Sequence, residues 1–237
     1  IVFEHNTHVE NSIEEAFAWH ERKGAFRRLM PPWELAEEVR ADDNLEEGSQ
    51  RIFKFPMGPV KMSWVAQHTK YDPPHSFEDV MLKGPFKSWH HTHNFEVTQE
   101  GKVHIHDRVN YKLPMGFLGN LVAGKMIKKR LNRMFTAREI RLERDLKRHA
   151  DFSHMKRKKI LVAGSSGLIG RQLVAFLDTG GHDVWRLVRR VTKPGEKEIR
   201  WNPSKGEINP DELEGFDTII HLGGAGIGDK RWSKKRM

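Results

Sequence analysis

The chain has 237 residues, of which 37% are hydrophobic and 31% charged, a composition typical of folded domains and long enough for two modest cores. It contains no cysteine, which excludes disulfides, cysteine nucleophiles and thiolate zinc sites and suits a reducing compartment. No stretch approaches the roughly 20 apolar residues of a membrane span, and the N-terminus lacks a signal pattern. We therefore expect a cytoplasmic protein without a membrane span.

The formal net charge of +9 is unevenly distributed, because residues 156–237 hold 17 basic and 10 acidic side chains. A basic surface can attract nucleic acid or anionic lipid. No nucleic-acid motif accompanies the charge, so we expect no specific nucleic-acid partner. The favoured interpretation is a solvated surface beside a site for a polyanionic cofactor.

The first part of the chain reads as a strand from Phe3, then a helix, then more strands. Ser12 and Glu15 have the spacing of a capping box, which predicts that a helix begins there. The proline-rich stretch from Pro31 to Gly48 predicts a loop. Five segments with period-two alternation follow, typical of an antiparallel meander: 51–55, 60–69, 76–82, 88–97 and 102–113.

A long helix is predicted from Gly116 to His149, because apolar residues recur there at helical spacing, with basic residues mostly around the other side. We expect this helix to cover one face of the sheet. The charged and polar residues 151–157 predict a linker between two domains, at 1–150 and 158–237.

The second domain opens with the order strand, glycine turn, helix, strand, which indicates a parallel βαβ unit. Lys158–Ala163 predicts a buried strand, and glycines follow at G-x-x-G-x-x-G spacing. Such glycines permit a tight turn and close approach to a pyrophosphate at the helix N-terminus. The predicted cofactor-binding residues here are Gly164, Ser165, Ser166, Gly167, Leu168, Ile169 and Gly170.

The next strand ends in Arg189 and Arg190, where an NAD site usually has an acidic residue for the ribose diol. Arginine there suits a 2′-phosphate, so NADP is predicted, with NAD and two merely solvated arginines as the alternatives. A further strand, Thr218–Leu222, runs into Gly223, Gly224 and Gly226, where backbone again can pass close to the cofactor.

These residues carry a resemblance. "KKILVAGSSGLIGRQLV", "RWNPSKGEI" and "FDTIIHLGGAGIGDKRWSKKRM" resemble the N-terminal half of atypical short-chain dehydrogenases of the nucleoside-diphosphate-sugar epimerase family. The resemblance implies a truncated NAD(P)-binding, Rossmann-like domain. It places the family's catalytic serine or threonine and tyrosine beyond Met237, since Tyr71 and Tyr111 both lie in the first domain. We therefore expect this stretch of chain to have no turnover by itself.

The first domain carries a second resemblance. "FAWHERKGAFRRLMPPWE", "GPFKSWHHTHNFE" and "YKLPMGFLGNLVAGKMIKKRLNRMF" resemble the SRPBCC, or START-like, ligand-binding domain. This resemblance implies an α+β helix-grip fold, with a cavity for a small hydrophobic ligand between the sheet and the long helix.

One hairpin defines the expected cavity lining. If residues 99–101 form a three-residue loop with Gly101 in the left-handed conformation, Phe95 lies opposite Ile105 and His93 opposite Asp107. The His93–Asp107 pair is interpreted either as a satisfied structural pair or as a ligand anchor. The predicted lining is Trp64, Trp89, His91, His93, Asp107 and Tyr111.

The same hairpin is rich in histidine, which raises the question of a metal. Alternation puts His90, His104 and His106 on the opposite face from His91 and His93, so no metal site is expected.

Three functions remain open at this point. The favoured one is an NAD(P)-dependent epimerase- or reductase-type protein with an appended ligand-binding domain. The alternatives are a non-enzymatic carrier or sensor of a hydrophobic molecule, and a binder of nucleic acid or membrane surfaces. Cofactor titration separates the first two, and a steep salt dependence of polynucleotide binding would mark the third.

Overall fold

The structure is a computed structural model that describes residues 1–57, 59–114 and 116–224. The chain divides into two compact units, Ile1–Met155 and Lys156–Met237. None of the described helices is long and apolar enough to cross a membrane.

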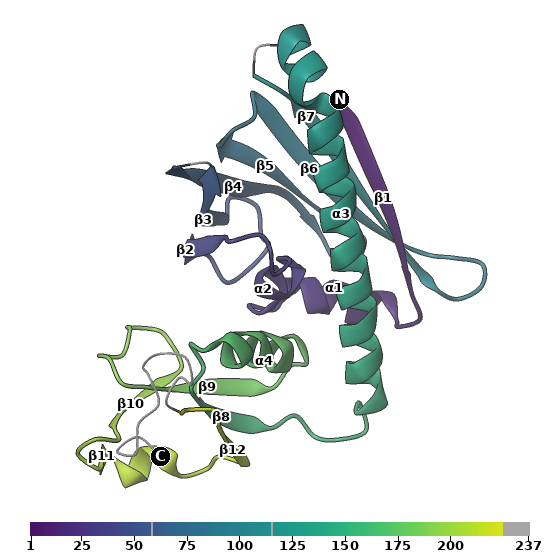
Figure 1. Ribbon diagram of the computed structural model, residues 1–237. Coiled ribbons are helices and arrows are strands. Elements are labelled where there is room, and N and C mark those ends of the chain that lie inside the picture. The colour runs from purple at the N-terminus through teal and green to yellow at the C-terminus, as the bar shows by residue number, and fades with distance from the viewer. Residues whose placement is uncertain (58, 115, 225–237) are drawn as a thin grey trace, which may run out of the picture. The chain divides into compact units, whose positions relative to one another are not determined.

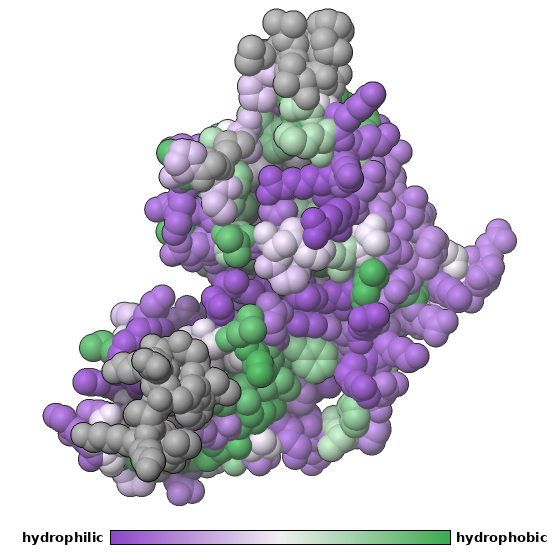
Figure 2. Space-filling model, in the orientation of Figure 1, coloured by the Kyte–Doolittle hydropathy of each residue, from purple (hydrophilic) through white to green (hydrophobic). Residues whose placement is uncertain are grey.

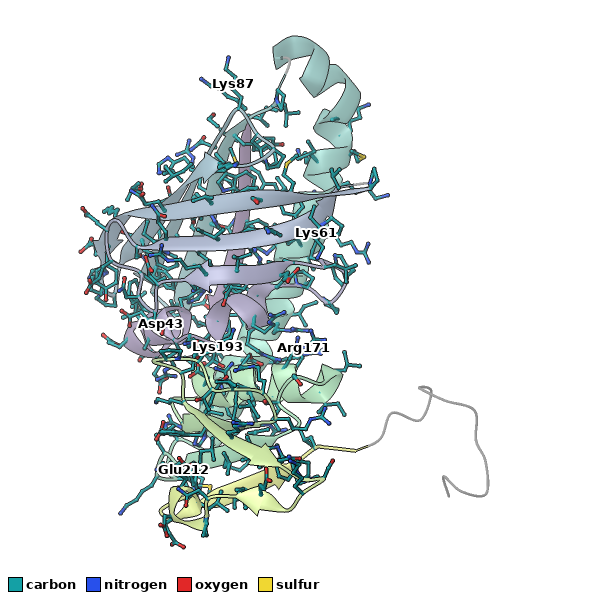
Figure 3. The ribbon with its side chains drawn as sticks, turned by 90° about the vertical axis from the view of Figure 1, so that its left-hand side faces the viewer. Asp43, Lys61, Lys87, Arg171, Lys193 and Glu212 are labelled. Carbon is teal, nitrogen blue, oxygen red and sulfur yellow. The ribbon has the colours of Figure 1, made fainter. Side chains whose placement is uncertain are left out.

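The first unit is an α+β fold built on a seven-stranded antiparallel sheet with the order β1-β7-β6-β5-β4-β3-β2 (Figure 1). The turned view in Figure 3 labels Lys61 on β4 and Lys87 between β5 and β6. The strands are β1 Val2–Val9, β2 Glu37–Ala41, β3 Gln50–Met57, β4 Val60–Asp72, β5 Ser76–Lys83, β6 Ser88–Val97 and β7 Val103–Lys112.

Three helices accompany this sheet: α1 Ile13–Glu21, α2 Ala25–Leu29 and α3 Gly116–Asp151. The capping box is confirmed, since Ser12 Oγ accepts the Glu15 N–H and the Glu15 carboxylate accepts the Ser12 N–H. Helix α3 runs along one face of the sheet (Figure 1). It buries Leu131, Phe135 and Leu142 against that face, as its periodicity predicts. Its last residue, Asp151, lies inside the stretch predicted as a linker.

One prediction for this unit is wrong. The stretch expected to be a loop contains β2, which pairs with β3 at the sheet edge. The sequence of β2, EEVRA, has no apolar alternation because nearly all of this edge strand is exposed, so its backbone pairing leaves no pattern in the side chains. Helix α2, five residues long, was also not predicted.

The second unit has a five-stranded sheet with the order β11-β10-β9-β8-β12. Four neighbouring strands, β10, β9, β8 and β12, are parallel, and the two-residue β11 is an antiparallel edge. Its elements are β8 Lys159–Ala163, α4 Leu168–Thr179, β9 Asp183–Val188, β10 Glu198–Asn202, β11 Glu207–Ile208, the 3-10 helix η1 Pro210–Leu213 and β12 Thr218–His221.

Helix α4 connects β8 to β9 and covers one face of these strands (Figure 1). Val174 and Leu177 of α4 pack against Ile160, Val162 and Val184. The sheet therefore presents the carboxyl ends of four parallel strands at one edge, where the glycine turn begins.

Candidate functional site

The turn after β8 brings two strand ends together through glycine. Gly164 has φ +76°, and a Cβ on it would lie 2.7 Å from the Leu222 carbonyl carbon and 2.8 Å from the Gly223 nitrogen. A side chain there would both strain the backbone and collide with the residues after β12. Gly164 is therefore required by the close approach of two backbones.

The start of α4 packs against the same turn. Gly167 is the N-cap of α4, and its N–H donates to the Gly164 carbonyl at 3.0 Å. A Cβ on Gly170 would lie 2.2 Å from the Gly164 oxygen. Among the described residues no side chain caps α4, so the amides of its first turn have no side-chain acceptor. These amides, at the positive end of the helix dipole, suit an anion.

The turn also occupies a special place in the sheet. Strands β9 and β10 lie on one side of β8 and β12 on the other, so the strand order reverses at β8. Ligands of open parallel sheets bind in the crevice outside the carboxyl ends at such a point. Gly164 and Gly223 meet there, with Gly224 exposed beside them, and Gly226 lies outside the described residues.

Apolar side chains next to this turn are exposed. Leu168 and Ile169, the first two residues of α4, are 81% and 68% exposed. Ile219 within β12 and Leu222 directly after it are also exposed, and Figure 2 shows hydrophobic side chains gathered on the visible face of this unit. Exposed apolar side chains around open amides are typical of a surface that receives a ligand.

The two arginines after β9 have different surroundings. Both are exposed, but Arg190 binds the Glu198 carboxylate through two nitrogens, with N–O distances of 2.8 and 2.5 Å. The Glu198 side chain is fully buried and also accepts the backbone N–H of Lys193, a residue labelled in Figure 3. Burial alone would raise the pKa of Glu198, but the hydrogen bonds from Arg190 and Lys193 lower it below its usual value.

A buried polar cluster lies on the inner face of the first unit's sheet. The predicted register is confirmed: Gly101 has φ +77°, Phe95 pairs with Ile105, and His93 pairs with Asp107. His93 Nδ1 lies 2.6 Å from Asp107 Oδ1. The same oxygen lies 3.1 Å from His91 Nε2, so one carboxylate contacts two imidazoles.

A second carboxylate, from β5, completes this cluster. Asp79 Oδ2 lies 3.5 Å from His91 Nδ1 and 3.9 Å from His93 Nε2. Each histidine thus faces Asp107 with one ring nitrogen and Asp79 with the other. All four side chains are between 6% and 16% exposed. We call Asp79, His91, His93 and Asp107 the inner cluster.

Burial sets the protonation of the inner cluster. It lowers the pKa of His91 and of His93, which favours neutral imidazoles. Burial also raises the pKa of Asp79. Asp107 differs: burial alone would raise its pKa, but His93 and His91 hold it well below the usual value. Arg138 of α3 acts electrostatically on both carboxylates, so one cation faces the cluster from the helix.

The aromatic members of the predicted lining lie in a neighbouring part of the same face. Trp64, Trp89 and Tyr111 belong to one hydrophobic cluster with Leu131 and Phe135 of α3. The rings of Trp64 and Trp89 are 5.1 Å apart and nearly perpendicular. The inner face therefore carries polar and aromatic groups side by side.

The comparisons with known proteins agree with the geometry of the second unit. Residues 160–237 match the NAD dependent epimerase/dehydratase family. Epimerase family proteins of Mycobacterium bovis and Mycobacterium leprae are 45% and 42% identical to this chain over 74 residues. These 74 residues are 31% of this chain and 24% of each relative, so the chain spans a small part of the curated relatives it matches.

Two solved structures extend the comparison. A nucleoside-diphosphate sugar epimerase from Corynebacterium glutamicum aligns over 94% of this chain, with 33% identity and a TM-score of 0.74, and this chain covers 46% of it. A Thalictrum norcoclaurine synthase aligns over 63% of this chain and 96% of its own, with 14% identity and a TM-score of 0.50. The second likeness concerns the fold alone, over a share close to that of the first unit.

Sequence reasoning missed three residues that shape these sites: Asp79, Arg138 and Glu198. The assignment of His90, His104 and His106 to the outer face is correct, since only His91 and His93 of the five histidines are buried. The expectation of no metal site rests on one hairpin and leaves out Asp79 of β5, which pairs with His91. Ligand atoms of Asp79, His91 and His93 lie within 4.8 Å of one another. Alternation along β5 could have placed Asp79 on the inner face, beside Phe77.

Proposed function

We propose that the second unit binds a nicotinamide dinucleotide at the Gly164–Gly170 turn, as the cofactor-binding part of an NAD(P)-dependent enzyme of epimerase or reductase type. The observation that carries this proposal is the close approach of the backbone after β8 to the start of α4 and to the residues after β12. At Gly164 and Gly170 a Cβ would collide with that neighbouring backbone. The epimerase/dehydratase family match over residues 160–237 supports it. In this proposal residues 158–237 are the first part of a Rossmann-like domain.

The cofactor would be held mainly by backbone. The pyrophosphate would accept the amides at the start of α4, and Gly164 and Gly223 would let the chain approach it without side-chain interference. Bound NAD(P) supplies reversible hydride transfer. Arg189 and Arg190 follow β9, the strand next to β8, where the adenosine ribose of a dinucleotide lies in sheets of this order. We propose NADP as the preferred cofactor on that ground.

For the first unit we propose an SRPBCC-like, helix-grip domain over residues 1–150 that takes a small hydrophobic molecule. The support is the antiparallel sheet covered by α3, with Trp64, Trp89 and Tyr111 on the covered face. The alternative is a non-enzymatic carrier or sensor, in which this unit alone functions. The presence or absence of dinucleotide binding separates the two proposals.

The decisive experiment is a titration of the chain with NADPH and NADH, followed by cofactor fluorescence, on two matched variants. Gly164→Ala and Gly195→Ala both place a Cβ at φ +76°, but only Gly164 has backbone atoms close to that Cβ. We expect Gly164→Ala to abolish binding and Gly195→Ala to retain it. Equal losses in the two variants, or no binding to the parent chain, would overturn the proposal in favour of the carrier.

A further inference from the structure

We propose that Asp79, His91 and His93 form a binding site for a divalent transition-metal ion such as Zn²⁺, on the inner face of the first unit's sheet. The proposal concerns the inner cluster and is independent of dinucleotide binding by the second unit. Two histidines and a carboxylate are a ligand set that zinc and iron both accept.

The donor atoms have the spacing of a coordination sphere. With metal–ligand distances of about 2.1 Å, the ligands of a tetrahedral ion lie roughly 3.4 Å apart. Asp79 Oδ2 is 3.5 Å from His91 Nδ1 and 3.9 Å from His93 Nε2. All three atoms lie within 4.8 Å of one another. The two pairs with Asp79 would need a contraction of less than an ångström, and a pair at the 4.8 Å limit would need about 1.4 Å, to close the site around an ion.

Asp107 orients both imidazoles for this role. Its Oδ1 lies 3.1 Å from His91 Nε2, in hydrogen-bond geometry, and 2.6 Å from His93 Nδ1, outside that geometry. A lone pair on either nitrogen would face the carboxylate, which favours a proton on both. The protonated nitrogens leave His91 Nδ1 and His93 Nε2 as lone pairs, and both face Asp79. A carboxylate that accepts the second ring N–H is the usual partner of metal-binding histidines.

Without a cation, this arrangement needs a proton on Asp79. Two imidazole lone pairs and the Asp79 carboxylate would face one another in a buried place, and a single proton on Asp79 can be donated to only one of them. A divalent ion accepts all three lone pairs at once.

Charge balance indicates what completes the coordination. A divalent ion with Asp79, Asp107 and Arg138 carries a net charge of about +1, and a buried site disfavours net charge. One hydroxide or anionic oxygen in the fourth position would neutralise it. Three protein ligands with one position left for water or a small anion are typical of reactive zinc sites.

Histidines on the outer face give the proposal its control. His104 and His106 lie on β7 with rings 6.1 Å apart, and both are partly exposed. His104 Nε2 contacts the Asn6 side chain rather than a carboxylate. A pair of this kind can bind Zn²⁺ weakly, so it tests whether Zn²⁺ binds at the inner cluster or at any pair of histidines.

The test is isothermal titration of the chelator-stripped chain with Zn²⁺, together with the visible spectrum of the chain loaded with Co²⁺. We expect one tight site per chain and the intense absorption of four-coordinate cobalt. Asp107→Asn should weaken Zn²⁺ binding by about 10- to 100-fold. Asp79→Asn and His91→Gln each remove a ligand and should weaken it more. His104→Gln should leave the affinity unchanged, and circular dichroism checks that each variant is folded.

Three outcomes overturn the proposal. They are the absence of Zn²⁺ and Co²⁺ binding by the parent chain, a loss of binding in His104→Gln as large as in Asp79→Asn, and a cobalt spectrum of the hydrated octahedral ion. The spectrum and stoichiometry of the parent chain decide the question even where a variant does not fold.

Discussion

The two units place their polar groups by opposite means. In the second unit the candidate site consists of backbone amides, and glycine at Gly164 and Gly170 keeps side chains out of the way. In the first unit the inner cluster consists of buried side chains from β5, β6 and β7, opposite Arg138 of α3. Amide dipoles are fixed and do not titrate, whereas buried carboxylates and imidazoles exchange protons and depend on their partners.

This difference says which perturbation each unit tolerates. A backbone site is broken by an added methyl group and is insensitive to pH. A side-chain cluster is broken when one partner is removed, because the remaining groups stay buried and unsatisfied.

The largest effect is expected from Asp107→Ala. Removing this carboxylate leaves His91 and His93 without the acceptor that both contact, so we expect a loss of about 3 kcal/mol or more in the free energy of unfolding. Asp43→Ala is the matched control, since Asp43 forms an exposed pair with Lys23 and should cost less than about 1 kcal/mol. Denaturant melts of the two variants measure both values. Equal losses would mean that the inner cluster contributes no more than a surface pair.

A second prediction concerns acid stability and His20 of α1. Burial lowers the pKa of His20 to about 4, although Nδ1 lies 2.8 Å from the Ala16 carbonyl, and His93, Asp107 and Arg138 also act on it. The unfolded chain takes up this proton near pH 6.5, so it binds more protons than the folded chain between about pH 6.5 and 4. Stability should therefore fall as the pH falls through this window, by about 3 kcal/mol from His20.

His20→Gln should flatten that part of the pH dependence, while His75→Gln, at an exposed position, should leave it unchanged. Denaturant melts at several pH values between 4 and 7 compare the three proteins. An unaltered slope in His20→Gln would show that other buried groups set the acid stability of the first unit.

The smallest effect is expected at the proposed contact with a cofactor 2′-phosphate. Both arginines are exposed, but Arg190 is already bound to Glu198, so the two should contribute unequally. We expect Arg189→Ala to reduce the preference for NADPH over NADH by about tenfold, or about 1.4 kcal/mol, and Arg190→Ala to reduce it less. The double variant should lose most of the preference. Equal affinities for the two cofactors in the parent chain would remove the basis of the NADP proposal.

Features that depend on neighbouring residues could be read from the sequence. The β6–β7 register follows from a three-residue loop with Gly101 in the left-handed conformation, and alternation then puts His91, His93 and Asp107 on one face. The glycine turn is equally local, since Gly164 and Gly170 are six positions apart and a strand and a helix flank them. Short-range geometry leaves few alternatives in both places.

The contacts between distant groups depend on the tertiary structure. Asp79 joins His91 because β5 pairs with β6 across the connection at residues 84–87, and no local pattern fixes that register. Glu198 meets Arg190 because β10 lies beside β9. Strand β2 pairs with β3 at the sheet edge, and its side chains show no alternation that would predict this pairing. Alternation determines the face on which a side chain lies, but the pairing of strands determines its partner. That pairing depends on the packing of the whole sheet, which is why the inner cluster became visible only in the folded chain.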